Sequence, residues 1–98
     1  MHVISPKRIK QAVSGHPEWA ASLKTWLRVS KTAKWKNSAD LKRSWANFEK
    51  VGICYVFDIM HNRVRLVAHI DFTYQLVFIR PILSHAEYDK DAWKNDCR

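Results

Sequence analysis

The stretch RVRLVAHIDF, residues 63–72, alternates apolar and polar side chains with the period of a β-strand. Its even positions are apolar, whereas its odd positions include Arg63, Arg65, His69 and Asp71. This alternation predicts a strand over residues 63–70 with one face in a core and the other face charged. β-Branched and aromatic runs at residues 53–59 and 74–79 lie on either side of it. The sequence therefore predicts three strands in an antiparallel meander.

Two helices are expected before these strands and one after them. Ser5-Pro6 is typical of a helix cap followed by proline at the first helical position, and Gly15 ends the first helix. After the break at residues 16–17, a second amphipathic helix is expected to run to about residue 32. Its apolar positions are Trp19, Leu23, Trp26 and Leu27. The capping-box pattern Ser84-His85-Ala86-Glu87 opens a last helix, which we expect to reach residue 91 or 93.

The expected order of elements is β-α-α-β-β-β-α, with the apolar residues 2–4 as an edge strand. The predicted fold class is α+β, with the helices packed on one face of a small, mainly antiparallel sheet. We expect the other face of the sheet to be basic and concave. At 98 residues, the chain is expected to form a single domain over residues 1–98.

The charge of the chain indicates a polyanionic partner, because 17 Lys and Arg against nine Asp and Glu give a formal net charge of +8. A hydrophobic content of 47% excludes a disordered tail. We expect a cytoplasmic protein, since no apolar run reaches the roughly 18 residues of a membrane span and the start lacks a signal-peptide pattern. Cys54 and Cys97 have neither metal-ligand nor redox spacing, so reduced thiols are expected, with a disulfide between them as the alternative.

Residues 31–50 are the most polar and basic part of the chain, and aromatic side chains are interleaved with the cations. We expect an ordered basic loop with a short helical turn at residues 38–44. Trp35 and Trp45 either stack on bases or anchor the loop by burial. The candidate RNA-binding residues of this segment are Lys34, Lys36, Lys42, Arg43 and Lys50.

Cleavage of RNA at a phosphodiester needs a base, an acid and cations that bind the phosphate. Arg65, and Arg80 at the end of the next strand, are candidates to hold that phosphate, because a guanidinium binds two oxygens at once. Arg63 is a candidate RNA contact or a solvated cation. His85 is a candidate for proton transfer at a helix start, which attracts phosphate, and Tyr88 for stacking or hydrogen bonding. Both residues are also compatible with a purely structural role. No metal-ligand spacing emerges from the five histidines, and no metal or cofactor is expected.

Several segments together resemble HigB-family toxins, a branch of the RelE superfamily. They are HVISPKR at residues 2–8, WKNSADLK at 35–42, YVFDI at 55–59, RVRLV at 63–67, FIR at 78–80 and SHAEYDK at 84–90. The resemblance extends over nearly the whole chain, and HAEYD is its most specific part. It implies the toxin of a type II toxin–antitoxin system, a metal-independent endoribonuclease (mRNA interferase) that cuts mRNA on the ribosome and inhibits translation. The implied partner is a HigA-type helix-turn-helix antitoxin in a hetero-oligomeric complex, with the free toxin a monomer.

By position, the resemblance implies that Arg65 corresponds to the strand arginine that contacts the scissile phosphate and Arg80 to the arginine on the last strand. It also implies that His85 and Tyr88 occupy positions of acid-base or stacking groups. The basic loop would then contact ribosomal RNA. This chain departs from the pattern at Met60-His61-Asn62, where relatives commonly have glycine and where the turn is expected to rely on Asn62. It also has Val64 where many relatives have an aromatic residue. Two alternatives stay open: a ParE-like inhibitor of DNA gyrase that cuts no RNA, and a non-catalytic RNA-binding module.

Overall fold

The computed structural model describes residues 1–61 and 63–98, and within them five strands form one sheet in the order β1-β5-β4-β3-β2. The edge strand β1 (His2–Ile4) pairs with β5 (Leu76–Ser84) in parallel. The remaining pairs are antiparallel and join β5 to β4 (Val64–Asp71), β4 to β3 (Cys54–Ile59) and β3 to β2 (Phe48–Val51). The α+β class, the mainly antiparallel sheet and the antiparallel meander are confirmed.

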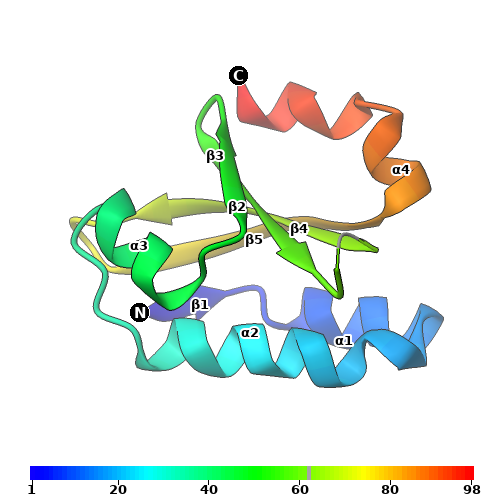
Figure 1. Ribbon diagram of the computed structural model, residues 1–98, viewed down its shortest axis with the longest axis horizontal. Coiled ribbons are helices and arrows are strands. Elements are labelled where there is room, and N and C mark those ends of the chain that lie inside the picture. Colours follow the sequence, from blue (N-terminus) through cyan, green and yellow to red (C-terminus); the bar gives the residue numbers. More distant parts are fainter. Residues whose placement is uncertain (62) are drawn as a thin grey trace.

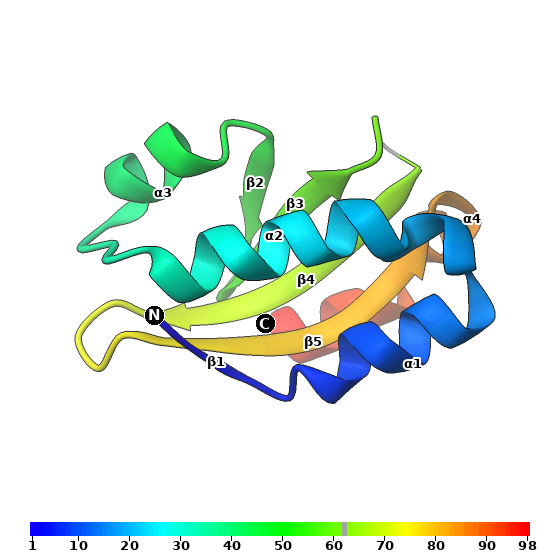
Figure 2. The ribbon, with the colours of Figure 1, turned by 90° about the horizontal axis from the view of Figure 1, so that it is seen from below.

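The helices α1 (Lys7–Gly15) and α2 (Ala20–Thr32) lie side by side on one face of the sheet, joined by the short 3-10 helix η1 (Pro17–Trp19) (Figures 1 and 2). The predicted helical turn is α3 (Ser38–Ser44). After β5, α4 (His85–Asp89) and the 3-10 helix η2 (Ala92–Cys97) lie on the side of the sheet away from α1 and α2 (Figure 1). Within the described residues, no helix is both long enough and apolar enough to cross a membrane.

The main core lies between the helical layer and the sheet. The even positions of β4 are buried there as predicted, together with Trp19, Leu23 and Trp26 from the helices. Trp26 packs edge-on against Phe57 of β3, with 5.4 Å between the ring centroids. Since alternate residues of a strand point to opposite faces, this packing turns Asp58 and Arg65 to the face that the helices leave free.

The opposite face is only partly the open basic surface that we expected. Cys54, Val56 and Val67 form a second apolar cluster there, covered by Trp93 and Cys97 of η2. β3 has apolar residues on both of its faces, and Val67 of β4 adds another on this face. Burial of these side chains away from water is favourable, so another segment packs over the middle of the face. The charged side chains of the face therefore lie beside η2 and do not form one continuous surface.

The expectation of reduced thiols is wrong for this structure, because Cys54 and Cys97 form a disulfide. Their Cα atoms are 5.2 Å apart, although 43 positions separate them in the sequence. Cysteine spacing did not reveal the pair, since the contact is created by the return of η2 onto the start of β3.

Several element boundaries differ from the prediction. Strand β2 lies within the segment that we expected to be a basic loop, and α4 ends at Asp89, with η2 as a separate element. Strand β5 continues beyond residue 79, and a bulge in it places Arg80 and Pro81 opposite Val67. Proline has no backbone N–H to donate, and in the bulge no ladder hydrogen bond is needed from it. Ser5 does not cap α1: its φ is +66°, and the cap residue is Pro6, with no side-chain hydrogen bond.

The turn between β3 and β4 uses Met60 and His61, whose φ angles of +53° and +52° lie in the left-handed region. The amide of Arg63 donates to the carbonyl of Met60 across 3.2 Å. The expectation that the turn relies on Asn62 concerns a residue outside those described. On either side of the turn, the register pairs Ile59 with Val64 and Asp58 with Arg65.

Candidate functional site

Arg65 of β4 is the centre of the candidate site. Its Nε donates to Oδ1 of Asp58 across 3.0 Å, and the two side chains are 13% and 34% exposed. The Nη1 atom of Arg65 is buried and has no hydrogen-bond partner among the described residues. One carboxylate holds the guanidinium in place, and because Nη1 is closed off from solvent, an anion can reach Arg65 only through the small part of the side chain that stays exposed.

Tyr88 of α4 covers this guanidinium, with 4.9 Å between Cζ of Arg65 and the centroid of the Tyr88 ring. The Tyr88 hydroxyl donates to Oε1 of Glu49 on β2 across 2.8 Å. Burial, followed by the hydrogen bond to Glu49, raises the pKa of Tyr88 to about 12. Tyr88 is therefore a neutral hydrogen-bond donor at physiological pH, and it links α4 to both β2 and β4.

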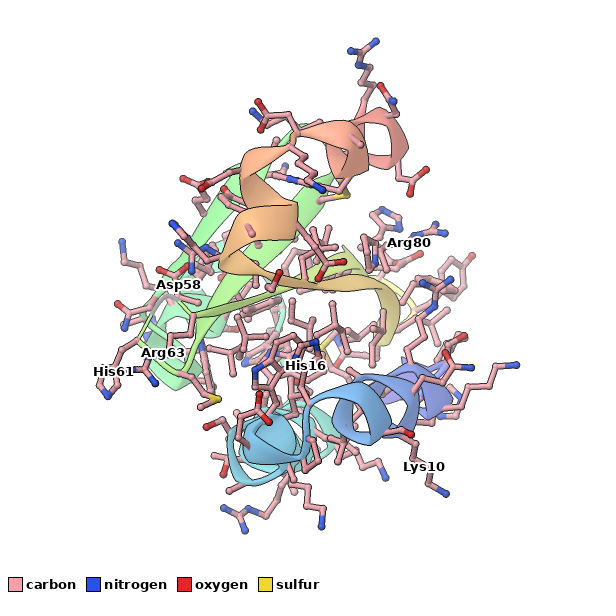
Figure 3. The ribbon with its side chains drawn as sticks, turned by 90° about the vertical axis from the view of Figure 1, so that its right-hand side faces the viewer. Lys10, His16, Asp58, His61, Arg63 and Arg80 are labelled. Atoms are coloured by element: carbon pink, nitrogen blue, oxygen red, sulfur yellow. A yellow bond between two sulfur atoms is a disulfide. The ribbon has the colours of Figure 1, made fainter. Side chains whose placement is uncertain are left out.

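These side chains line a small, polar pocket of about 260 Å³, with Arg65, Tyr88, Asp58 and Glu49 joined in its wall by Ala46, Asn47 and Phe48. A larger cleft of about 560 Å³ shares Asn47 and Asp58 with it and extends to His61 and Arg63. Figure 3 shows Asp58, His61 and Arg63 on the same side of the molecule. The two hollows are therefore neighbours and together give the site a path for an extended ligand.

Arg80 is not brought to this pocket. It is exposed in the bulge of β5, and Figure 3 shows it on the opposite side of the C-terminal helical segment from Asp58 and Arg63. The sequence pattern predicted Arg65 and Arg80 on neighbouring strands, but α4 and η2 lie between their side chains. The phosphate-binding role of Arg80 stays a prediction.

His85 is the first residue of α4 and is exposed. Its backbone amide donates to the carbonyl of Arg63 across 3.1 Å, and its Nε2 lies 3.3 Å from Oδ2 of Asp89. The helix start is fixed by the predicted capping box, in which Ser84 and Glu87 exchange hydrogen bonds of 3.0 and 3.2 Å. The bonds from the Ser84 amide and hydroxyl lower the pKa of Glu87. Proton transfer by His85 is not tested by this geometry.

The remaining candidate RNA-binding residues are exposed: Arg63, Lys34, Lys36, Lys42, Arg43 and Lys50. Arg43 forms an ion pair with Asp40 at 2.7 Å, and the Lys50 ammonium lies 5.6 Å from the centroid of the Tyr55 ring. Trp35 is buried and donates to the Ser44 hydroxyl across 2.9 Å, and Trp45 is half-buried against the main core. Anchoring of the loop, the alternative to base stacking, is therefore confirmed for Trp35, whereas Trp45 also lines the larger cleft and both interpretations stay open for it.

Two carboxylates of the pocket were missed by sequence reasoning. Asp58 is the charged residue in the apolar run YVFDI, and the short turn before Val64 is a signal that it faces Arg65 across a hairpin. Glu49 lies on β2, in a segment whose basic composition indicated a loop. Its contact with Tyr88 spans 39 positions and leaves no signal in the sequence.

Comparison with known proteins gives the family. Residues 19–91 match the family model of HigB toxins, described as the RelE-like toxic component of a toxin–antitoxin system. The chain is 30% identical over 93 residues to the mRNA interferase HigB of Escherichia coli O6:H1, which covers 92% of this chain and 90% of that protein. It is 32% identical over 92 residues to the mRNA interferase toxin HigB of Escherichia coli K12, covering 91% and 88%. The mRNA interferase HigB of Shigella flexneri shows the same identity and coverage.

Proposed function

The chain belongs to the HigB family of RelE-like toxins, and from this membership we infer that it is the toxin of a toxin–antitoxin system and acts as an mRNA interferase. It is an endoribonuclease that cleaves mRNA and thereby inhibits translation and growth. The observation that supports a location for the activity is the Arg65–Tyr88 pair, since a guanidinium held by Asp58 lies there beside a neutral hydroxyl donor in the wall of a polar pocket.

The proposed reaction is attack of a ribose 2′-hydroxyl on the adjacent phosphorus, with release of the 5′-oxygen. One group must take the proton of the 2′-hydroxyl, another must protonate the leaving oxygen, and the charge that grows on the phosphate must be stabilised. Arg65 binds the scissile phosphate through the part of its side chain that lines the pocket, because Asp58 engages Nε and Nη1 is buried. Tyr88 turns its hydroxyl from Glu49 to a phosphate oxygen, and it does not stack on a base, because Arg65 and Trp93 cover the two faces of its ring.

Two groups are proposed for proton transfer. His85 lies at the exposed start of α4, and its proximity to Asp89 orients the imidazole. Glu49 is the more available of the two pocket carboxylates, because Asp58 is engaged by Arg65 and the partner of Glu49 is the neutral Tyr88. Glu49 lines the pocket itself, whereas His85 does not and would reach the bound phosphate from the start of α4.

Cations outside the pocket are proposed to hold the RNA. Arg63 in the larger cleft is placed to contact the same strand beyond the scissile phosphate. Arg80, on the other side of the C-terminal segment, binds another phosphate. The exposed cations of residues 34–50 anchor ribosomal RNA, so that cleavage depends on the ribosome. The antitoxin is proposed to be of the HigA helix-turn-helix type in a hetero-oligomeric complex, and the toxin to act in the cytoplasm.

The test is induction of the toxin in cells with and without its antitoxin, followed by mapping of RNA 5′ ends. New ends inside coding sequences are expected with the wild type, and their loss is expected with Arg65→Ala. The matched control is Arg8→Ala, which removes the same charge from the exposed face of α1 and should cut as the wild type does. Altered DNA supercoiling with no new RNA ends would identify a gyrase inhibitor instead, and salt-dependent RNA binding with no new ends would identify a binding module.

A further inference from the structure

Tyr88 contacts a second aromatic side chain that the proposed reaction does not use. Trp93 of η2 stacks on Tyr88 with 4.9 Å between the ring centroids and 17° between the planes. The indole N–H of Trp93 also donates to the Tyr88 carbonyl across 2.9 Å. Tyr88 therefore contacts Arg65 and Trp93 at once, and both its ring and its backbone are held by Trp93.

Helix α4 cannot hold Tyr88 by itself. It has five residues, and none of them, all within the described part of the chain, is buried. So short a helix is marginal without tertiary contacts. Trp93, by contrast, is 6% exposed and packs into the second cluster with Val56 and Val67. The position of Tyr88 over Arg65 thus depends on the anchoring of η2.

A covalent bond fastens η2 to the sheet, since Cys97 at its end is joined to Cys54 at the start of β3. The amide of Ile53 donates to the Cys97 carbonyl across 2.7 Å. At Gly52, whose φ is +57°, an added Cβ would lie 1.7 Å from that carbonyl oxygen, so the close approach requires glycine. The disulfide, Trp93, Tyr88 and Arg65 consequently form one continuous series of contacts.

We propose that Trp93 is a positioning residue for Tyr88, and that the Cys54–Cys97 disulfide keeps Trp93 in place, so that RNA cleavage responds to the redox state of this bond. The inference rests on the proposed function of the Arg65 pocket. A dithiol reductant transfers two electrons and two protons to the bond and itself becomes a disulfide, which leaves two cysteine thiols and an intact chain. The main core is built from other residues, so the fold remains while η2 gains freedom.

The first test compares Trp93→Phe with Trp93→Ala in a purified, ribosome-dependent cleavage assay. Phe keeps an aromatic surface for Tyr88, and its kcat should stay within about threefold of the wild type. Ala should lower kcat on the order of 10-fold with KM nearly constant, because it misplaces a group that acts in the transition state. Equal kcat values for Trp93→Ala and the wild type would overturn the positioning role.

The second test compares oxidised and dithiothreitol-reduced wild type with the double variant Cys54→Ala/Cys97→Ala. The reduced wild type and the double variant should show the same lowered kcat, and the double variant should not respond to dithiothreitol. The ring protons of Tyr88, observed by NMR at neutral pH, should lose the upfield shift caused by Trp93 when the wild type is reduced. Unchanged kcat and unchanged Tyr88 shifts on reduction would refute the redox response. Full activity of Arg65→Ala would instead refute the proposed site, and the NMR shifts would still decide whether the disulfide positions Tyr88.

Discussion

Asp58 and Arg65 are paired directly across the β3–β4 ladder, and their side chains meet on the face away from α1 and α2 with 3.0 Å between Oδ1 and Nε. Because the register of the hairpin places Asp58 opposite Arg65, it also sets the orientation of the Arg65 guanidinium. Asp58 also neutralises the charge of Arg65 while the pocket is empty. Because the ion pair is partly buried, it contributes to both the stability of the hairpin and the geometry of the site.

Asp58→Ala should lower the free energy of unfolding by about 1–3 kcal/mol, since it leaves Arg65 without its carboxylate. The loss should be below that of a fully buried pair because Asp58 is 34% exposed. Chemical denaturation measures the effect. The control is Glu18→Ala, which removes the exposed contact with His16 and should cost less than about 0.5 kcal/mol. Equal losses for the two variants would show that the Asp58–Arg65 pair adds nothing.

The sequence predicted the features that depend on the local pattern within one strand or helix. The alternation of residues 63–70 predicted which residues of β4 enter the main core, and the pattern at Ser84 and Glu87 predicted the capping box. Features that depend on the return of one segment onto another were missed. The Cys54–Cys97 bond, the contact of Glu49 with Tyr88 and the cover over Val67 all join η2 or α4 to distant strands.

The same distinction explains the candidate site. Arg65, Tyr88 and the helix start at His85 were chosen because local patterns place cations and aromatic residues there, and Arg65 and Tyr88 do meet. Arg80 was expected beside them because it lies on the neighbouring strand. The bulge at Pro81 and the path of the C-terminal segment separate it from Asp58 and Arg63, and neither feature has a periodic signature.

Arg65→Lys should retain the charge and still lose on the order of 10²-fold in cleavage rate, because an ammonium cannot bind Asp58 and a phosphate through one planar fork. Cleavage of mRNA on purified ribosomes measures the rate, and circular dichroism checks that the variant is folded. A lysine variant with the wild-type rate would show that only charge is needed at this position.

His85→Ala should reduce cleavage on the order of 10²-fold and leave antitoxin affinity nearly intact, since the residue is exposed and proposed to transfer a proton. The matched control is His2→Ala, which removes an exposed histidine from the edge strand β1. That variant should cleave at the wild-type rate. If His85→Ala still arrests growth as strongly as the wild type, proton transfer belongs to another group, of which Glu49 is the nearest candidate.

The capping box should make stability depend on pH in the acidic range. Hydrogen bonds from Ser84 lower the pKa of Glu87 below its ordinary value of 4.5. The carboxylate therefore stabilises the folded state above that value, and the contribution is lost as the pH falls through the lowered pKa. Glu87→Gln keeps an acceptor for the Ser84 amide but does not titrate, so its thermal stability should fall less between pH 6 and pH 3 (both approximate) than that of the wild type. Identical pH profiles of the two proteins would show that titration of Glu87 does not contribute to the loss of stability in acid.

Ser84→Ala should lower the free energy of unfolding by about 1 kcal/mol at neutral pH.

The turn that sets the register of Arg65 carries backbone strain that glycine relieves. His61 is exposed, and its φ of +52° is costly for a residue with a Cβ. His61→Gly should raise the free energy of unfolding by about 0.5–1 kcal/mol, because the left-handed conformation costs a residue with a Cβ about 1–2 kcal/mol, which is more than the roughly 0.5–1 kcal/mol that the greater freedom of glycine in the unfolded chain costs. His61→Ala removes the same imidazole but keeps the Cβ, so it should give no such gain. Thermal or chemical denaturation of the two variants separates the backbone effect from the loss of the side chain. A gain in both would place the strain in the imidazole, and a gain in neither would mean that the turn between β3 and β4 is not strained at His61.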